Sequence, residues 1–136
     1  MNVYATYQKQ AFATAPPEDI LLKLYEGAIL RVKSALQNWD QGYKGQVWEK
    51  INQTVAIIAE LDNTLDRKNG DPQLIDELHA LYRFMLRELN FCALRQDRAR
   101  LQNVLDVLQT LNTGWEGAAQ ELKKQGCKNH ALAATL

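Results

Sequence analysis

The sequence has little cysteine, proline or glycine, and neither charge is in excess. Its 136 residues include two cysteines, three prolines and seven glycines. So few prolines and glycines exclude a β-sandwich or barrel with many turns, and they argue against long disorder. Two cysteines cannot form the disulfide framework of a small secreted domain. The 16 basic and 16 acidic side chains give zero net charge, which excludes a nucleic-acid binder that relies on a basic excess.

Segments that target a chain or hold it in a membrane are missing as well. Residues 1–8 contain no basic stretch followed by an apolar one, so we expect no signal peptide. No stretch approaches 18 uninterrupted apolar residues, so we expect no membrane insertion. Cys92 lies in an apolar run and is interpreted as a buried thiol. The expected location is therefore the reducing cytoplasm.

Motifs that carry chemistry are absent. The sequence contains neither common glycine-rich nucleotide motif, nor the Gly-x-Ser-x-Gly turn of hydrolases, nor the Glu-x-x-His pair of di-iron bundles. His79 lies beside an apolar stripe and is interpreted as a boundary residue. Cys127 and His130 have the spacing of half a metal site, without a second half. We therefore expect no metal, no cofactor and no enzyme, and a binding module is the favoured interpretation.

Apolar residues recur every three or four positions through four long segments, and no segment of any length alternates with a period of two. The segments cover residues 17–42, about 45–66, about 72–96 and 97–126. Links of only a few residues make neighbouring helices antiparallel. The sequence therefore predicts an all-α fold, an antiparallel up-down four-helix bundle.

Residues suited to helix ends mark the boundaries of these segments. Pro17, with Glu18 and Asp19 after it, favours a helix start, because proline loses no hydrogen bond there and the acids meet the positive end of the helix dipole. Asp71 is expected to cap the third helix and Asp97 the fourth, and Gly126 is expected to end the fourth. The chain then divides into an N-terminal segment, 1–16, a bundle, 17–125, and a flexible tail, 126–136.

The N-terminal segment carries three aromatic residues, Tyr4, Tyr7 and Phe12, at spacings of three and five. This spacing suits one or two helical turns, but so short a helix is unstable alone in water. We expect the segment to pack on the bundle as a lid that a partner displaces or repositions.

The first long helix is apolar over more of its circumference than one core needs. A helix that faces a single core shows a stripe a little over 100° wide, whereas residues 20–30 are apolar at most positions. An uncovered surplus would be an adhesive patch. We therefore predict that partner binding involves the lid aromatics, this helix and one tyrosine of the third helix: Tyr4, Tyr7, Phe12, Ile20, Leu24, Tyr25, Ile29 and Tyr82.

Several short motifs occur in order along the chain. They are Tyr4-x-x-Tyr-Gln8, Thr14-Ala-Pro-Pro-Glu18-x-Ile20, Leu24-Tyr-Glu-Gly-Ala-Ile29, Ile58-Ala-Glu-Leu-Asp-Asn-Thr-Leu-Asp66, Leu81-Tyr-Arg-Phe-Met85 and a late Trp115. Together they resemble the FliS family of flagellar export chaperones over residues 4–122. Pro16, Lys23 and Glu26 depart from the family pattern, and these departures concern details of the binding face.

The resemblance implies a helical bundle with a short N-terminal segment lying on it. It also implies a cytoplasmic, non-enzymatic chaperone that binds the disordered C-terminal region of flagellin, prevents premature polymerisation and assists type III flagellar secretion. Components of the flagellar export gate are a further implied partner class, and the chain would be a monomer or a homodimer. Two alternatives stay open: a homodimeric bundle that acts as an adaptor for a different client, and a redox or metal protein built on Cys92, Cys127 and the two histidines.

Overall fold

The described part of the chain folds mainly into four long helices. The computed structural model describes residues 13–135, with side chains described up to residue 125. The helices are α2 (Glu18–Gln41), α3 (Lys44–Asn63), α4 (Pro72–Arg95) and α5 (Arg98–Thr135). No strand occurs within this described range, so the predicted all-α helical bundle is confirmed.

The predicted caps at Asp71 and Asp97 are present. The Asp71 carboxylate accepts a hydrogen bond from the Gln73 N–H at 3.2 Å, and Pro72 occupies the first position of α4, where its missing N–H costs nothing. The Asp97 carboxylate accepts one from the Ala99 N–H at 3.2 Å. Each cap satisfies a donor that the helix leaves unpaired, which is worth about 1 kcal/mol.

The second helix of the bundle is shorter than predicted, because α3 ends at Asn63 and Asp66 lies in the following loop. The Asp66 carboxylate accepts hydrogen bonds from the backbone N–H groups of Asn69 and Lys68, each at 3.1 Å, and from the Asn69 side-chain amide at 3.1 Å. These bonds, with that of the Asn69 N–H foremost, lower the pKa of Asp66. The side chain thus offers the backbone an alternative to the helix and favours the early end.

The prediction that Gly126 ends the fourth helix is wrong, because α5 continues to Thr135. A glycine inside a helix costs only about 1 kcal/mol relative to alanine. A glycine ends a helix only when it adopts the left-handed conformation just after the last turn. α5 already passes through Gly114 and Gly117 without interruption. The boundary drawn at residue 126 therefore does not coincide with a helix end.

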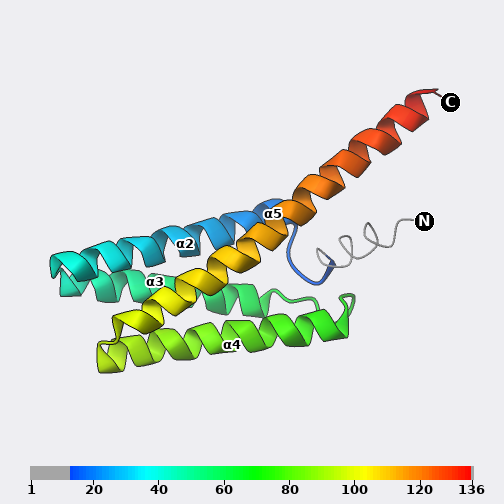
Figure 1. The fold of residues 1–136 in the computed structure, drawn as a ribbon. Coiled ribbons are helices and arrows are strands. Elements are labelled where there is room, and N and C mark those ends of the chain that lie inside the picture. Colours follow the sequence, from blue (N-terminus) through cyan, green and yellow to red (C-terminus); the bar gives the residue numbers. More distant parts are fainter. Residues whose placement is uncertain (1–12, 136) are drawn as a thin grey trace.

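The helices are arranged as a ring in which α2 and α4 each pack against both α3 and α5. Figure 1 shows α2, α3 and α4 alongside one another, whereas α5 crosses them obliquely. It starts beside the C-terminal end of α4, passes the N-terminal half of α2, and extends beyond the other helices. One side of the bundle is therefore covered by a helix that moves away from α4 along its length.

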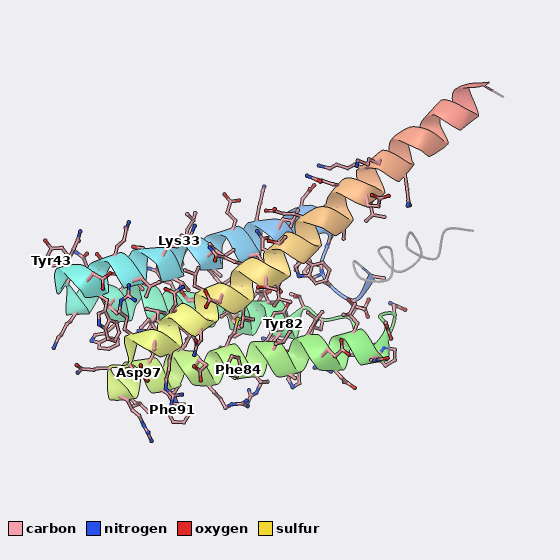
Figure 2. The ribbon with its side chains drawn as sticks, viewed as in Figure 1. Lys33, Tyr43, Tyr82, Phe84, Phe91 and Asp97 are labelled. Atoms are coloured by element: carbon pink, nitrogen blue, oxygen red, sulfur yellow. The ribbon has the colours of Figure 1, made fainter. Side chains whose placement is uncertain are left out.

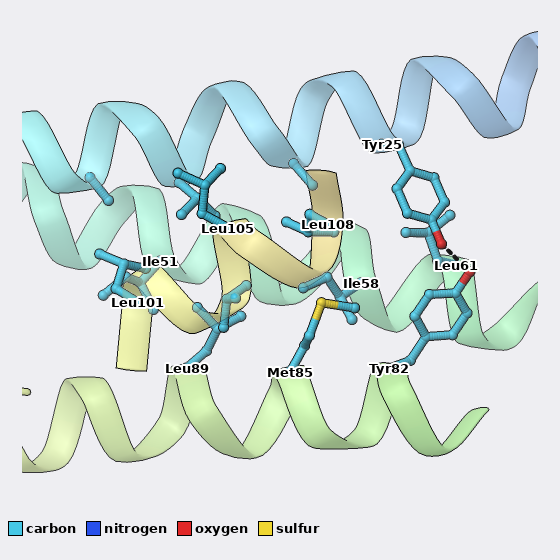
Figure 3. Close-up of a cluster of buried hydrophobic side chains, with 14 of the residues drawn as sticks. Tyr25, Ile51, Ile58, Leu61, Tyr82, Met85, Leu89, Leu101, Leu105 and Leu108 are labelled. Atoms are coloured by element: carbon cyan, nitrogen blue, oxygen red, sulfur yellow. Dashed lines mark hydrogen bonds between the residues drawn. The ribbon is translucent and has the colours of Figure 1, made fainter. Parts of the chain in front are cut away.

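Apolar side chains from all four helices form one continuous core (Figure 3). Its fully buried members recur every three or four positions along each helix, as the sequence predicts. They include Leu21, Ile58, Met85, Leu89 and Leu108. Burying a side chain of this kind contributes about 1.5–3 kcal/mol before the cost of ordering it, so the core is the main source of stability.

The chain just before α2 is anchored on the loop between α3 and α4. The Asp66 N–H donates to the Thr14 carbonyl oxygen at 2.9 Å, and the Thr14 side chain is fully buried. Gly70 lies directly beneath it: a Cβ at this position would be 2.6 Å from Cγ2 of Thr14. Residue 70 must therefore be small for the segment to stay docked.

Replacing Gly70 with alanine is expected to destabilise the protein by about 1–3 kcal/mol through overpacking. The added Cβ would also lie 2.7 Å from the Asp66 carbonyl oxygen and 2.8 Å from Cδ1 of Ile75. Backbone and buried atoms on three sides leave the methyl group little room. Urea denaturation would measure the free energy of unfolding.

Gly117→Ala is the matched control for this experiment. Nothing lies within 4 Å of a Cβ at Gly117, and the residue is inside α5. Alanine should therefore stabilise the helix by about 0.5–1 kcal/mol. The packing argument is refuted if Gly70→Ala is as stable as the parent.

Candidate partner-binding surface

Tyr25 and Tyr82, both predicted as binding residues, face each other inside the bundle. Their side chains are fully buried, and their hydroxyl oxygens are 2.7 Å apart (Figure 3). One hydroxyl donates to the other, so each satisfies a polar group that has left water. In this conformation neither tyrosine presents surface to a partner, and their part in partner binding stays a prediction.

The environment of the pair keeps both phenols neutral. Burial raises the pKa of Tyr25 to about 12, against the smaller lowering effect of hydrogen bonds with Tyr82 and Trp115. Burial also raises the pKa of Tyr82, and the neighbouring Tyr25 adds to the increase. The two groups therefore form an uncharged hydrogen bond across the core, from α2 to α4.

Trp115 brings α5 to the same point. Its ring lies against Tyr25 with the centroids 6.4 Å apart and the planes inclined by 52°, and only 6% of the residue is exposed. Aromatic pairs at this separation contribute about 0.5–1.5 kcal/mol beyond the area that they bury. This contact fastens α5 over the N-terminal half of α2 and supports its oblique course.

The other predicted residues of α2 do not form one patch. Leu24 and Ile29 are half-buried against the core, on opposite flanks of the buried stripe, because five residues correspond to a rotation of about 140°. Ile20 is 53% exposed. Leu30, which is not among the predicted binding residues, is 59% exposed. Since α2 packs against two neighbours, most of its wide apolar surface is covered within the bundle.

The three lid aromatics, Tyr4, Tyr7 and Phe12, lie outside the described residues. The structure describes the segment from residue 13 onward, where Thr14 is anchored and Ala15 packs against the core. The place of the lid residues remains a prediction.

An apolar hollow lies between α4 and α5, where the sequence analysis named no site. It is lined by Leu81 from α4 and by Asp106, Val107, Thr110 and Leu111 from α5, and its volume is about 250 Å³. We call it the α4–α5 hollow. Its three apolar side chains are only half-buried. The sequence feature that could have indicated this hollow is Val107. It directly precedes the core residue Leu108, and an apolar residue one position before a core residue lies on the flank of the buried stripe of its helix.

The same seam between α4 and α5 is closed by polar groups nearer the start of α5. Nη1 of Arg100 donates to Oε1 of Glu88 at 3.0 Å, and Nδ2 of Asn103 donates to Oε2 of Glu88 at 3.2 Å. Glu88 is 9% exposed, so these partners compensate a charge that is largely withdrawn from water. The seam is thus bridged by polar groups near the start of α5 and is apolar and accessible at the α4–α5 hollow.

The residues behind the redox alternative have structural roles where they are described. Nδ1 of His79 lies 2.6 Å from Oδ1 of Asp62, and the partly buried ring confirms that His79 is a boundary residue. Cys92 is buried as predicted, and burial raises its pKa to about 11. Among the described residues no three His, Cys, Asp or Glu side chains are grouped to hold a metal ion. Nor does any helix in that part of the chain have the length and apolar character to span a membrane.

Comparison with known proteins identifies the family. The model of the family described as "Flagellar protein FliS" matches residues 1–122. The chain belongs to the FliS family. The matched range takes in α2, α3, α4 and α5 as far as Trp115 and the turns just after it, so it covers the whole core described above.

Three curated FliS proteins are similar to this chain, and each is named "Flagellar secretion chaperone FliS". The one from Bacillus subtilis (strain 168) is 28% identical over 123 residues, which cover 90% of each chain. The one from Campylobacter jejuni (serotype O:6) is 29% identical over 115 residues, 82% of this chain and 87% of the relative. The one from Vibrio cholerae is 26% identical over 107 residues, 76% of each.

Replacing Tyr25 with phenylalanine should lower the free energy of unfolding by about 1–3 kcal/mol, because the buried Tyr82 hydroxyl loses its partner. Adding Tyr82→Phe to this variant should restore part of the loss, since the unpaired hydroxyl is then removed. Urea denaturation of the single and double variants measures both effects.

Tyr43→Phe provides the control for the loss of a hydroxyl group. Tyr43 is 55% exposed, so this change should stay within about 0.5 kcal/mol of the parent. A Tyr25→Phe variant no less stable than Tyr43→Phe would refute the importance of the tyrosine pair.

Proposed function

We propose that this chain is a cytoplasmic export chaperone that binds the disordered C-terminal region of flagellin, prevents its premature polymerisation and assists its type III flagellar secretion. Its family and the relatives named flagellar secretion chaperones support the general activity. The single observation that carries the choice of a binding mode is the α4–α5 hollow, an open apolar site on the surface of the bundle.

An amphipathic client segment needs an apolar surface that replaces its packing in the assembled filament. Leu81, Val107 and Leu111 offer such a surface, and α2 separately presents two exposed apolar side chains, Ile20 and Leu30. Leu24 and Ile29 stay proposed contacts because their side chains are partly accessible. A disordered segment that folds on binding typically buries 1,000–3,000 Å², so it would extend well beyond the hollow itself.

The rim of the α4–α5 hollow supplies little directional hydrogen bonding. The Thr110 hydroxyl donates to the Asp106 carbonyl oxygen at 2.8 Å, and the Asp106 carboxylate accepts from the Gln102 amide at 3.0 Å. Because these groups are already paired within α5, binding would depend mainly on apolar contact. Such contact tolerates sequence variation in the client and allows release without a nucleotide-driven step.

The N-terminal segment has enough residues before its anchor to reach this surface. A Cβ at Gly70 would meet both Thr14 and Ile75, so the anchor lies near Ile75, and Leu81 is six residues further along α4, about 9 Å away. A helix of twelve residues spans about 18 Å, so residues 1–12 are long enough to cover the hollow with Tyr4, Tyr7 or Phe12. Each buried aromatic would contribute about 1.5–3 kcal/mol before the cost of ordering. The result is a weak closure that a client can displace.

Leu111→Asp should weaken binding of a flagellin C-terminal peptide at least tenfold, or about 1.4 kcal/mol, because it places a charge in the hollow. Isothermal titration calorimetry measures the affinity, and circular dichroism melting checks the fold. Leu94→Asp is the matched control: Leu94 is 72% exposed and lies near the turn between α4 and α5, away from the hollow.

Equal affinities of the parent and the Leu111→Asp variant would contradict the binding mode. Light scattering on the same samples tests the adaptor alternative. A stoichiometric complex with the peptide supports the chaperone, whereas a stable homodimer that ignores the peptide supports the adaptor.

Deleting residues 1–12 should change peptide affinity and reduce the solubility of the client-free protein, because an apolar surface loses its cover. Calorimetry and a concentration-dependent turbidity assay measure the two effects. Tyr4→Ser/Tyr7→Ser keeps the length of the segment and separates the aromatic contribution from that of the backbone. If the deletion alters neither quantity, the lid proposal is wrong.

A further inference from the structure

Two tight turns meet at the end of the bundle opposite the Thr14 anchor. Figure 2 shows Tyr43, from the turn between α2 and α3, and Asp97, from the turn between α4 and α5, at this same end. A hollow of about 70 Å³ bridges the turns, and we call it the turn hollow. Its lining residues come from both: Trp39, Gly42, Lys44, Val47, Trp48 and Gln96.

The floor of the turn hollow is apolar and preformed. The rings of Trp39 and Trp48 meet edge to face, with centroids 6.0 Å apart and planes inclined by 78°. Both rings pack against the core. Val47, which also lines the turn hollow, is 2% exposed. Side chains held in this way give a partner a surface that needs no rearrangement before binding.

Residues around the turn hollow depart from what stability alone favours. Gln96 has φ 52° and ψ 48°, a left-handed conformation that glycine adopts at lower cost. Tyr43 occupies the N-cap of α3 without a side-chain hydrogen bond, where serine or aspartate would contribute about 1 kcal/mol. Local choices that sacrifice stability concentrate at functional sites.

The charges at this end leave a positive surplus. Arg98 and Asp40 form two parallel hydrogen bonds of 2.8 and 2.9 Å, so these charges neutralise each other. Lys44 and Arg95 form no salt bridge with the carboxylates of the described residues. Lys44 is also the first residue of α3, where the helix dipole favours an acid over a base. A carboxylate from outside would complement this arrangement.

We propose that the turn hollow is a second docking site, for an acidic peptide segment of another protein. The segment inserts one branched aliphatic side chain over Trp39 and Trp48 and pairs an adjacent carboxylate with Lys44. The volume suits one side chain, since pockets for small molecules span about 300–1,000 Å³. The turn hollow shares no lining residue with the α4–α5 hollow, so the two are separate sites.

Two tripeptides of opposite charge test the proposal on the full chain. Acetyl-Glu-Leu-Glu-amide should shift the indole N–H resonances of Trp39 and Trp48 in a saturable way, and Trp115 serves as the internal reference. Acetyl-Lys-Leu-Lys-amide should bind roughly tenfold more weakly, because it meets Lys44 and Arg95 with like charge. Lys44→Glu should reduce or reverse this preference. The side chain is exposed, and thermal melting checks that the variant is folded.

Equal responses to the two peptides, no shift with either at tens-of-millimolar concentration, or an unchanged preference in Lys44→Glu would each overturn the proposal. Competition with a flagellin C-terminal peptide separates the two sites. The proposal requires that the flagellin peptide bind parent and Lys44→Glu equally and leave the tripeptide response intact. If it displaces the tripeptide, the turn hollow belongs to the client site and the second partner is refuted, whatever the result for Leu111→Asp.

Discussion

The hydrogen bond between Tyr25 and Tyr82 is the constraint on which the arrangement of this bundle depends. Two hydroxyl groups in an apolar core satisfy each other only when α2 and α4 keep one register and one separation. Leucine packing alone tolerates sliding, whereas a buried polar pair does not. Trp115 joins the same point from α5, so three helices are aligned by one cluster of aromatic rings.

The course of α5 follows from this cluster and creates the proposed binding surface. At its start α5 is tied to α4 through Glu88, Arg100 and Asn103, and further on it is tied to α2 through Trp115. A helix fastened to different neighbours at its two contacts must cross the bundle obliquely (Figure 1). The seam with α4 then opens toward Leu81 and Leu111, so an apolar hollow remains accessible. The family of this chain includes proteins named flagellar secretion chaperones.

Local chemistry made most of the fold predictable, and long-range geometry limited the prediction of the site. Asp71 and Asp97 cap helices through contacts within three residues, and such contacts can be predicted from sequence. Asp66 was misjudged because its carboxylate could serve either a helix or a loop. The burial of Tyr25 and the opening beside Leu111 depend on the crossing angle of α5, which arises from packing between distant segments. A wide apolar face on α2 therefore predicted an exposed patch, although a second neighbour covers most of it.

The position of α5 in the chain has a consequence for biosynthesis. Because α5 contacts both α2 and α4 and completes the ring, the earlier helices emerge from the ribosome with one side of their core still in water. N-terminal elements are made first, yet here they cannot finish their interior until the last helix appears. During its own synthesis, this chain therefore exposes apolar helix surface that is buried only after α5 is made. It is proposed to cover the same kind of surface on its client.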